Sequence, residues 1–339
     1  MRILLIKLSS LGDLIHSFPA LQAARAQFPE LRCDWVVEQG LAEVPALHPV
    51  VDRVISVNLR YYKKNKAAFW KENYFSTVKQ QLRATPYDYV IDAQGLIKSG
   101  ILTLMAGGNT AGLAWQSARE GWASLAYQHK YVVPMEHAIL RVKNLFAQTL
   151  GYPADLTGAI DYGLPLVNVK NNQAGPVFLF HGTTWISKHW PAQHWKALAA
   201  LLVQAGYPIA LTWGNAVEEQ RARWIVEGLE PEKVTLYPKG SLRTLYNALY
   251  TARAAIAGDT GLAHLAAALG LPQLSLFGPT DFARTGTRGL YQTHLQTQRA
   301  CQPCLARVCR YQPDTALCMQ DLTPMQVMGA LEALLCSIA

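Results

Sequence analysis

The chain has 339 residues, half of them apolar, which is enough for two domains that each bury a core of their own. Its formal net charge is +8, from 31 Lys and Arg against 23 Asp and Glu, so an anionic partner is favoured. No apolar run is long enough to span a membrane, no nucleic-acid-binding motif is present, and the first apolar run is too short for a signal peptide. We therefore expect a cytoplasmic protein with a shaped site for an anion and no nucleic-acid partner.

The N-terminal segment predicts a buried strand over residues 1–7, then a turn of small residues, then a helix. Ser9, Ser10 and Gly12 form that turn, which exposes backbone N–H groups and the positive end of a helix dipole. Asp13 stands where the helix starts. Two roles are open for its carboxylate: an N-cap, the commonest use of Asp at a helix start, or a general base at the top of a strand.

Strands and helices alternate through the rest of the first half. The first helix is expected over residues 13–28, with a bend near Pro19. The sequence then predicts strands at 33–37, 53–57 and 89–92, helices at 67–82 and 137–150, and a small-residue turn that opens another helix at 93–99. This alternation predicts an α/β domain with a parallel, doubly wound sheet.

Basic residues gather in short clusters between these elements. They are Arg60, Lys63 and Lys64 in a loop, Lys98 and Arg119 after predicted strands, and His137 and Arg141 on one helix face. A solvated charged loop is the commonest explanation of such clusters, and an anion-binding surface is the alternative.

Residues 151–175 lack periodicity and hold several Gly, Pro and Asn, so we expect an interdomain linker there. The alternation then restarts, with strands at 177–180, 208–213, 254–258 and 274–277. A last amphipathic helix is predicted at residues 323–338. Two similar α/β domains with a cleft between them account for this pattern.

Small or polar side chains follow each strand of the second half directly. Because the carboxyl ends of parallel strands share one edge of a sheet, we expect these side chains to form one ligand site. The amides at Thr260 and Gly261 suit a diphosphate at a helix N-terminus, with Lys188 as the countercharge. Glu218 suits the diol of a ribose. The chain has neither a Walker lysine loop nor a G-x-G-x-x-G motif, which disfavours a kinase or a dehydrogenase.

Six short motifs stand at the predicted strand ends. They are Lys7-x-Ser9-Ser10-x-Gly12-Asp13, Asp34-Trp35-Val36-Val37-Glu38, Asp92-Ala93-Gln94-Gly95-Leu96-Ile97-Lys98-Ser99, Lys188-His189-Trp190-Pro191, Asp259-Thr260-Gly261-Leu262-x-His264 and Phe277-Gly278-Pro279-Thr280. Together they resemble the ADP-heptose:lipopolysaccharide heptosyltransferases of glycosyltransferase family nine. The resemblance runs from residue 1 to about residue 281 and is nearest to the heptosyltransferase I branch.

The resemblance implies the GT-B architecture, in which two Rossmann-like, doubly wound domains face each other across a cleft. It implies an acceptor-binding domain at residues 1–160 and a domain for the nucleotide sugar at residues 175–320. A final helix at residues 322–339 would pack back on the first domain.

The resemblance also implies a reaction: inverting transfer of L-glycero-D-manno-heptose from ADP-heptose to Kdo of Kdo-lipid A, in lipopolysaccharide core synthesis at the periphery of the inner membrane. Inversion needs a base opposite the leaving group, a role that suits Asp13, while Lys188 stabilises the departing ADP without a catalytic metal. The donor-binding candidates are Ser9, Ser10, Gly12, Thr183, Thr184, Lys188, Trp213, Glu218, Asp259, Thr260, Gly261 and His264. The acceptor-binding candidates are Arg60, Lys63, Lys64, Lys98, Arg119, His137 and Arg141.

Four of the six cysteines, Cys301, Cys304, Cys309 and Cys318, are clustered near the C-terminus, as in heptosyltransferase II and other branches. This feature leaves transfer to an inner-core heptose open as an alternative. The four thiols are candidates for a structural zinc or iron site, or remain reduced and unliganded. Two further alternatives are a non-catalytic module that binds lipopolysaccharide precursors and a sugar-nucleotide epimerase.

Overall fold

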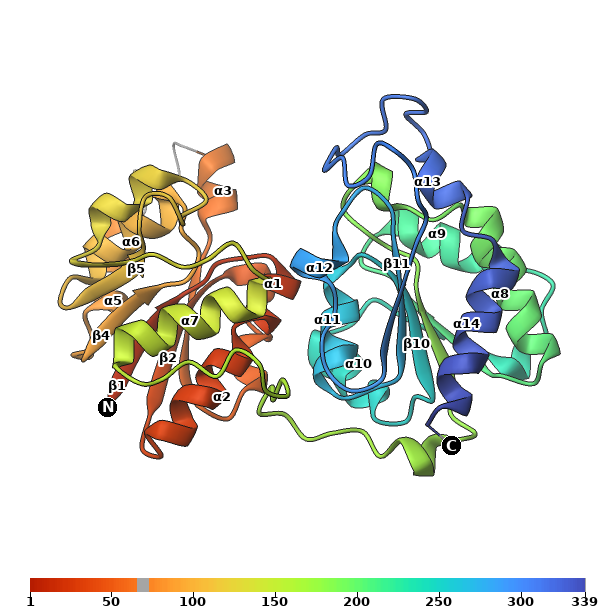
Figure 1. The fold of residues 1–339 in the computed structure, drawn as a ribbon, viewed down its shortest axis with the longest axis horizontal. Coiled ribbons are helices and arrows are strands. Elements are labelled where there is room, and N and C mark those ends of the chain that lie inside the picture. Colours follow the sequence, from red (N-terminus) through yellow and green to blue (C-terminus); the bar gives the residue numbers. More distant parts are fainter. Residues whose placement is uncertain (66–72, 339) are drawn as a thin grey trace. The chain divides into compact units, whose positions relative to one another are not determined.

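The computed structural model describes residues 1–65 and 73–338, apart from the Lys63 side chain. The chain divides into two compact units, Met1–Leu164 and Pro165–Ala339, each built on its own sheet (Figure 1). The division falls inside the segment expected to be the linker. No helix within the described ranges is both long enough and apolar enough to cross a bilayer.

The first unit is a six-stranded parallel sheet with the order β3-β2-β1-β4-β5-β6. Its strands are β1 (Arg2–Ile6), β2 (Arg32–Glu38), β3 (Val51–Val57), β4 (Tyr89–Asp92), β5 (Thr110–Leu113) and β6 (His129–Tyr131). Its helices are α1 (Leu11–Ile15), α2 (Phe18–Gln27), α3 (Leu59–Lys64), α5 (Tyr74–Leu82), α6 (Ile97–Ala106) and α7 (Ala138–Leu150), with short 3-10 helices η1 (Gln39–Leu41), η2 (Pro45–Leu47) and η3 (Gly121–Ala126).

The second unit repeats this design with the strand order β12-β11-β10-β7-β8-β9, again all parallel. Its strands are β7 (Val177–Phe180), β8 (Ile209–Thr212), β9 (Val234–Tyr237), β10 (Ala254–Gly258), β11 (Gln273–Phe277) and β12 (Gln292–Gln296). Its helices are α8 (Ala192–Gln204), α9 (Ala216–Ile225), α10 (Leu242–Leu249), α11 (Gly261–Ala268), α12 (Phe282–Thr285), α13 (Leu317–Gln320) and α14 (Pro324–Cys336), with 3-10 helices η4 (Val169–Asn172), η5 (Ile186–Lys188) and η6 (Pro231–Lys233).

The central strands are continuous apolar runs because helices cover both faces of a doubly wound sheet. Four of the five residues of β1 and all five of β10 are buried. In each unit the chain reverses its direction of winding beside the first strand, between β1 and β4 and between β7 and β10. Such a switch point opens a crevice at the carboxyl ends of the strands, where doubly wound folds bind ligands.

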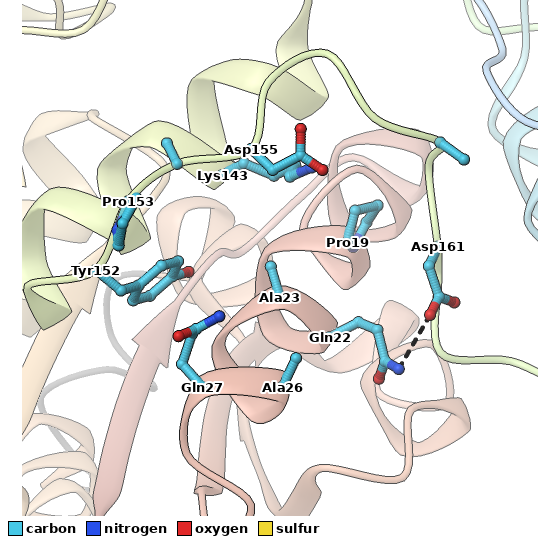
Figure 2. Close-up of a pocket in the computed structure, with 12 residues that line it drawn as sticks. Pro19, Gln22, Ala23, Ala26, Gln27, Lys143, Tyr152, Pro153, Asp155 and Asp161 are labelled. Carbon is cyan, nitrogen blue, oxygen red and sulfur yellow. Dashed lines mark hydrogen bonds between the residues drawn. The ribbon is translucent and has the colours of Figure 1, made fainter.

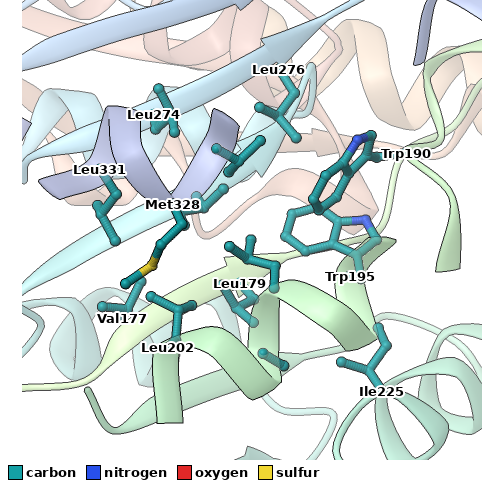
Figure 3. Close-up of a cluster of buried hydrophobic side chains, with 14 of the residues drawn as sticks. Val177, Leu179, Trp190, Trp195, Leu202, Ile225, Leu274, Leu276, Met328 and Leu331 are labelled. Carbon is teal, nitrogen blue, oxygen red and sulfur yellow. The ribbon is translucent and has the colours of Figure 1, made fainter. Parts of the chain in front are cut away.

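The core of the second unit corrects the expectation for the last helix. Val327, Met328 and Leu331 of α14 are buried in the same apolar cluster as Val177 and Leu202. Figure 3 shows Met328 directed toward Val177 and Leu202, and Figure 1 shows α14 beside α8. The prediction that residues 322–339 pack on the first domain is therefore wrong, because the apolar stripe of this helix is covered by its own unit.

Other expected elements also differ in detail. The helix predicted over residues 13–28 is two helices, α1 and α2, and the basic loop at Arg60 is the helix α3. The helix predicted from residue 67 is described only as α5, since residues 66–72 lie outside the described part of the chain. Strands β6, β9 and β12 were not predicted, because none of them is fully buried and because β6 and β12 have polar sequences.

Candidate functional site

Asp13 lies at the switch point of the first unit, in the short helix that follows β1. Its Oδ2 accepts two hydrogen bonds from Ser10, one from the backbone N–H and one from Oγ, both at 2.8 Å. Ser10 is the N-cap of α1, so Asp13 occupies the third helical position and not the N-cap position, which was one of the two roles open for it. Its second oxygen, Oδ1, has no hydrogen-bond partner among the described residues and remains available for a substrate proton.

The turn before Asp13 is held by Gln94, which follows β4. Gln94 Oε1 accepts the N–H groups of Leu8 at 2.9 Å and Ser9 at 3.2 Å. The N–H groups of Ser9 and Ser10 are thus already satisfied within the protein, although both residues were predicted to contact the donor. The Ser10 amide holds Asp13 in place and the Ser9 amide is bound to Gln94, so the turn offers fewer free donors than its composition suggested.

Lys7, the last residue before the turn, was not a predicted site residue. Its side chain is 8% exposed, and its Nζ donates to the carbonyl of Ala93 at 2.7 Å. Burial lowers the pKa of Lys7, while the negative charges of Asp13 and Asp92 oppose that effect. The signal for this residue was present in the sequence, because a lysine interrupts an otherwise apolar strand.

Asp92 ends β4 and is completely buried beside this lysine. Its Oδ1 accepts the N–H groups of Gln94 and Gly95, and its Oδ2 accepts the hydroxyl of Tyr127 at 2.7 Å. Burial raises the pKa of Asp92, and these hydrogen bonds act in the opposite direction. Asp92 therefore shapes the loop that carries Gln94.

The predicted acceptor cations fall into two groups. Within residues 1–65 and 73–338, the side chains of Arg60, Lys98 and Arg119 have no hydrogen-bond or ion-pair partner, and Lys64 is exposed. Arg119 and Arg141 lie near enough to Lys7 for their charges to contribute to its lowered pKa. The Lys63 side chain is outside the described part of the structure.

The other group, His137 and Arg141, is tied into the fold. His137 is 3% exposed and caps α7, accepting the N–H of Ile139 at Nδ1, and its ring lies 5.6 Å from that of His16. The guanidinium of Arg141 donates to the carbonyls of Pro134 and Ser117, each at 2.6 Å. Both residues thus organise the loops at this edge of the sheet.

Glu38, at the end of β2, was not a predicted site residue. It is 4% exposed, and its Oε1 accepts the backbone N–H of Arg60 at 2.7 Å. Its Oε2 is buried and has no hydrogen-bond partner in the described part of the chain. A buried carboxylate oxygen without a partner is costly, which marks this strand end as a site of polar recognition.

Lys188 and Asp259 form the centre of the second site. Lys188 Nζ lies 2.6 Å from Asp259 Oδ2, which also accepts the hydroxyl of Thr280 at 2.6 Å. Asp259 follows β10 and Thr280 follows β11, so residues from neighbouring strand ends meet as predicted. Lys188 Nζ also lies 4.5 Å from the centre of the Trp185 ring.

The N-terminus of α11 adds unpaired donors to this site. Thr260 is its N-cap and Gly261 its first residue, and the N–H groups of Gly261 and Leu262 have no acceptor in the structure as described, whereas that of Ala263 donates to the carbonyl of Thr260 at 3.2 Å. Thr183, after β7, donates its hydroxyl to the carbonyl of Asp259 at 3.1 Å, which joins the two strands that flank the switch point. An eight-residue helix with free N–H groups beside a lysine favours an anionic group.

Glu218 lies in the first turn of α9. Its Oε2 accepts the N–H of Gly214 at 2.7 Å. A Cβ on Gly182 would lie 2.9 Å from the Glu218 carboxylate, so a larger residue at position 182 would require the Glu218 side chain to shift. The neighbouring candidates Thr184, Trp213 and His264 follow β7, β8 and β10, and His264 is buried in α11.

Two cavities have a volume of about 270 Å³ each: the first lies away from these strand ends, and the second borders them through Ser187 and Pro279, the neighbours of Lys188 and Thr280. Figure 2 shows the first, where Gln22, Lys143, Tyr152 and Asp155 line a polar hollow beside α2, and none of the predicted site residues lines it. The second is largely apolar and is lined by Cys301, Cys304, Cys309 and Cys318. All six cysteines are free, and the described residues contain no group of three or more His, Cys, Asp or Glu spaced to hold a metal.

Comparison with known proteins identifies relatives over the whole chain. The profile of glycosyltransferase family 9 (heptosyltransferase) matches residues 75–314. Lipopolysaccharide heptosyltransferase 1 of Pseudomonas aeruginosa is 44% identical over 351 aligned positions, which cover 99% of this chain and 98% of that protein.

Two solved structures have the same fold. Escherichia coli heptosyltransferase WaaC with ADP gives a TM-score of 0.85 at 35% identity, with 98% of this chain and 100% of that chain covered. The same enzyme with ADP-2-deoxy-2-fluoro heptose gives a TM-score of 0.83 at 35% identity, with coverages of 98% and 99%.

Proposed function

The chain belongs to glycosyltransferase family 9, the heptosyltransferases, and we propose that it transfers L-glycero-D-manno-heptose from ADP-heptose to Kdo of Kdo-lipid A with inversion. The observation that best supports a nucleotide-sugar donor is the cluster of Lys188, Asp259 and Thr280 at the switch point of the second unit. The full-length similarity to a structure with an ADP-heptose analogue supports the same assignment.

The donor's diphosphate would bind at the N-terminus of α11. The free N–H groups of Gly261 and its neighbour donate to phosphate oxygens, and the Lys188 ammonium moves from Asp259 toward the new negative charge. Glu218 accepts hydrogen bonds from the ribose diol. These groups stabilise ADP as the bond between the anomeric carbon and the diphosphate oxygen breaks and ADP leaves with the electron pair.

Asp13 would act as the base on the acceptor. Its Oδ1, which has no partner in the described chain, takes the proton of the acceptor hydroxyl while that oxygen forms a bond to the anomeric carbon. Attack from the face opposite the leaving group inverts the anomeric centre. Oδ2 stays hydrogen-bonded to Ser10, which fixes the carboxylate during the transfer.

The acceptor's anionic groups would meet the cations of the first unit. Arg60, Lys98 and Arg119 have side chains without partners in the residues described, so they are available for the Kdo carboxylate and the lipid A phosphates. The acceptor is a membrane lipid, and the proposal therefore includes peripheral contact with the cytoplasmic face of the inner membrane.

Two alternatives differ in the acceptor or the catalytic role. Transfer to an inner-core heptose would need a different acceptor site and the same donor site, whereas a binding module or an epimerase would need no base aimed at an acceptor hydroxyl. The four cysteines keep a purely structural role in this proposal, whether or not they hold zinc or iron, because the countercharge for the diphosphate comes from Lys188 and the α11 amides.

The deciding experiment is ADP release with purified protein, ADP-heptose and either Kdo-lipid A or the same lipid already carrying one heptose. We expect release with the first acceptor and not with the second, and none without an acceptor. Release with the heptose-bearing lipid alone would indicate the alternative transferase. Turnover of ADP-heptose without any acceptor would contradict the proposal.

A further inference from the structure

Several large apolar side chains are exposed on the outer surface of the first unit around α6. Six of them, with exposed fractions between 43% and 66%, come from α6, η3 and the loop before η3: Ile97, Ile101, Leu104, Trp115, Trp122 and Leu125. We call this set the α6–η3 patch. Contiguous apolar surface of this kind marks an interaction site in most water-soluble proteins.

The patch is continuous across three segments of the chain. Ile97, Ile101 and Leu104 are spaced by four and three residues, so they lie on one face of α6. A Cβ on Gly100 would lie 3.3 Å from the Cβ of Ala126, which shows how closely η3 packs beside that face. The rings of Trp115 and Trp122 lie 4.8 Å apart, edge to face.

These side chains are not needed for the core beneath them. The inward residues of the same segments, Leu102, Ala123 and Ala126, are buried and complete the packing. The outward side chains therefore expose apolar area that the fold does not use.

The charges of the segments that form the patch are positive on balance. Lys98 lies in the first turn of α6, and Arg119 lies between the two tryptophans in the sequence. Glu120 is the only acidic residue between positions 93 and 135, and its Oε2 is occupied by the N–H of Ile97 at 2.7 Å. Apolar side chains, a tryptophan pair and flanking cations are the combination that favours the interface of an anionic bilayer.

We propose that the α6–η3 patch docks the first unit on an anionic phospholipid bilayer, with Leu104, Trp122 and Leu125 entering the interface. The inference rests on the proposed function, which needs an acceptor held in a membrane, and it adds the surface that meets that membrane. Ile97 and Trp115 follow the carboxyl ends of β4 and β5, at the edge of the sheet that also carries Asp13. Docking there brings the lipid surface to the strand ends where the acceptor is expected.

The test is sedimentation with sucrose-loaded vesicles of phosphatidylcholine containing about 30% phosphatidylglycerol, using the full-length protein. We expect the triple variant Leu104→Ser, Trp122→Ser, Leu125→Ser to bind these vesicles at least tenfold more weakly than the parent. The matched control is Leu166→Ser, Leu290→Ser, Met325→Ser, which removes side chains of similar exposure from the second unit and should bind as the parent does. Vesicles of phosphatidylcholine alone should bind the parent less than the anionic vesicles.

A second assay, the rate of heptose transfer to a water-soluble, de-acylated acceptor, tests the proposed function without a membrane and so separates it from this inference. The patch variant should transfer to that acceptor within about twofold of the parent rate, which shows that its fold and chemistry are intact. Vesicle binding decides the inference even if the parent transfers nothing. Equal vesicle binding by parent and patch variant would overturn it, and so would a parent that binds no anionic vesicles and instead forms a dimer that the patch variant loses.

Discussion

Ser10 donates two hydrogen bonds to a single oxygen of Asp13, one from its backbone N–H and one from its hydroxyl, and each is 2.8 Å long. One carboxylate can therefore cap α1 with Oδ2 and keep Oδ1 for chemistry. The sequence offered capping and catalysis as competing roles for Asp13, and this geometry makes them compatible. The two roles separate only when the charge is removed and the oxygen acceptor is kept.

The Asp13→Asn variant makes that separation. Asparagine keeps an oxygen that can accept from Ser10 but cannot take a proton from the acceptor, so we expect a folded protein whose kcat is lower by on the order of a hundredfold or more. Steady-state ADP release and thermal unfolding are the measurements. The control is Asp155→Asn, because Asp155 holds a surface turn through the N–H groups of Thr157 and Gly158. A kcat near that of the parent would place the base elsewhere.

Lys188 offers a second test, of donor binding. Replacing Lys188 with Ala removes the cation expected on the diphosphate, and a hydrogen bond to a charged group contributes about 1.5–3 kcal/mol. We therefore expect ADP affinity to fall by on the order of 10- to 100-fold, measured by titration calorimetry. Lys196→Ala is a close control: Lys196 lies 3.0 Å from Glu227 and 4.7 Å from the Trp224 ring, much as Lys188 lies beside Asp259 and Trp185. Equal losses in the two variants would contradict the assignment.

The sequence predicted the two doubly wound sheets and the strand ends that carry Asp13, Lys188 and Asp259, because apolar runs and small-residue turns are local signals. It did not predict that α14 packs within the second unit, since an apolar stripe shows that a helix is covered without showing what covers it. The role of Gln94 was also out of reach. Its contacts join β4 to the turn after β1, across more than eighty residues of chain.

Removing the unpartnered cations of the first unit should weaken acceptor binding without changing donor binding. The double variant Arg60→Ala, Arg119→Ala should weaken binding of Kdo-lipid A, with a loss that shrinks as salt rises, and leave ADP-heptose affinity nearly unchanged. Arg141 is left intact, because its guanidinium holds the carbonyls of Ser117 and Pro134 and its removal would disturb the fold. Binding assays at low and high salt provide the comparison.

The control for this pair is Lys239→Ala, Arg310→Ala, which removes the same charge from exposed positions of the second unit. It should leave acceptor binding close to that of the parent. A similar loss of donor and acceptor affinity in the Arg60 and Arg119 variant would argue against separate binding surfaces.

Because of its buried imidazole, His48 should lower the free energy of unfolding of the protein in mild acid. Burial, helped by the charge of Arg25 and opposed by Asp161, lowers the pKa of His48 to about 4 in the folded protein, against about 6.5 when unfolded. The unfolded chain binds more protons between these values, so the contribution is complete above about pH 6.5 and is lost as the pH falls toward 4. At pH 5 this loss amounts to about 2 kcal/mol.

The His48→Asn variant tests this, because Asn does not titrate and its Oδ1 can accept the N–H of Val50 in place of Nδ1. Urea unfolding at pH 7.5 and 5.0 gives the change in the free energy of unfolding with pH for each protein separately. The variant's loss of packing against Phe18 is the same at both pH values and therefore does not affect this change. We expect the parent to lose about 2 kcal/mol more than the variant over this interval. Identical pH dependence in both proteins would show that His48 is protonated as easily in the folded state as in the unfolded chain.

The cysteine cavity predicts an order of thiol reactivity. Burial raises the pKa of Cys318 to about 11. Burial also acts to raise the pKa of Cys309, but hydrogen bonds from nearby backbone N–H groups and the charge of Arg299 lower it below the usual value. The thiolate is the reactive form, so iodoacetamide at pH 7.5 should label Cys309 well before Cys318. Mass spectrometry of tryptic peptides measures the labelling of each cysteine over time. Protection of all four cavity cysteines, relieved by a chelator and matched by about one metal equivalent per chain in elemental analysis, would contradict this order and establish a structural metal site.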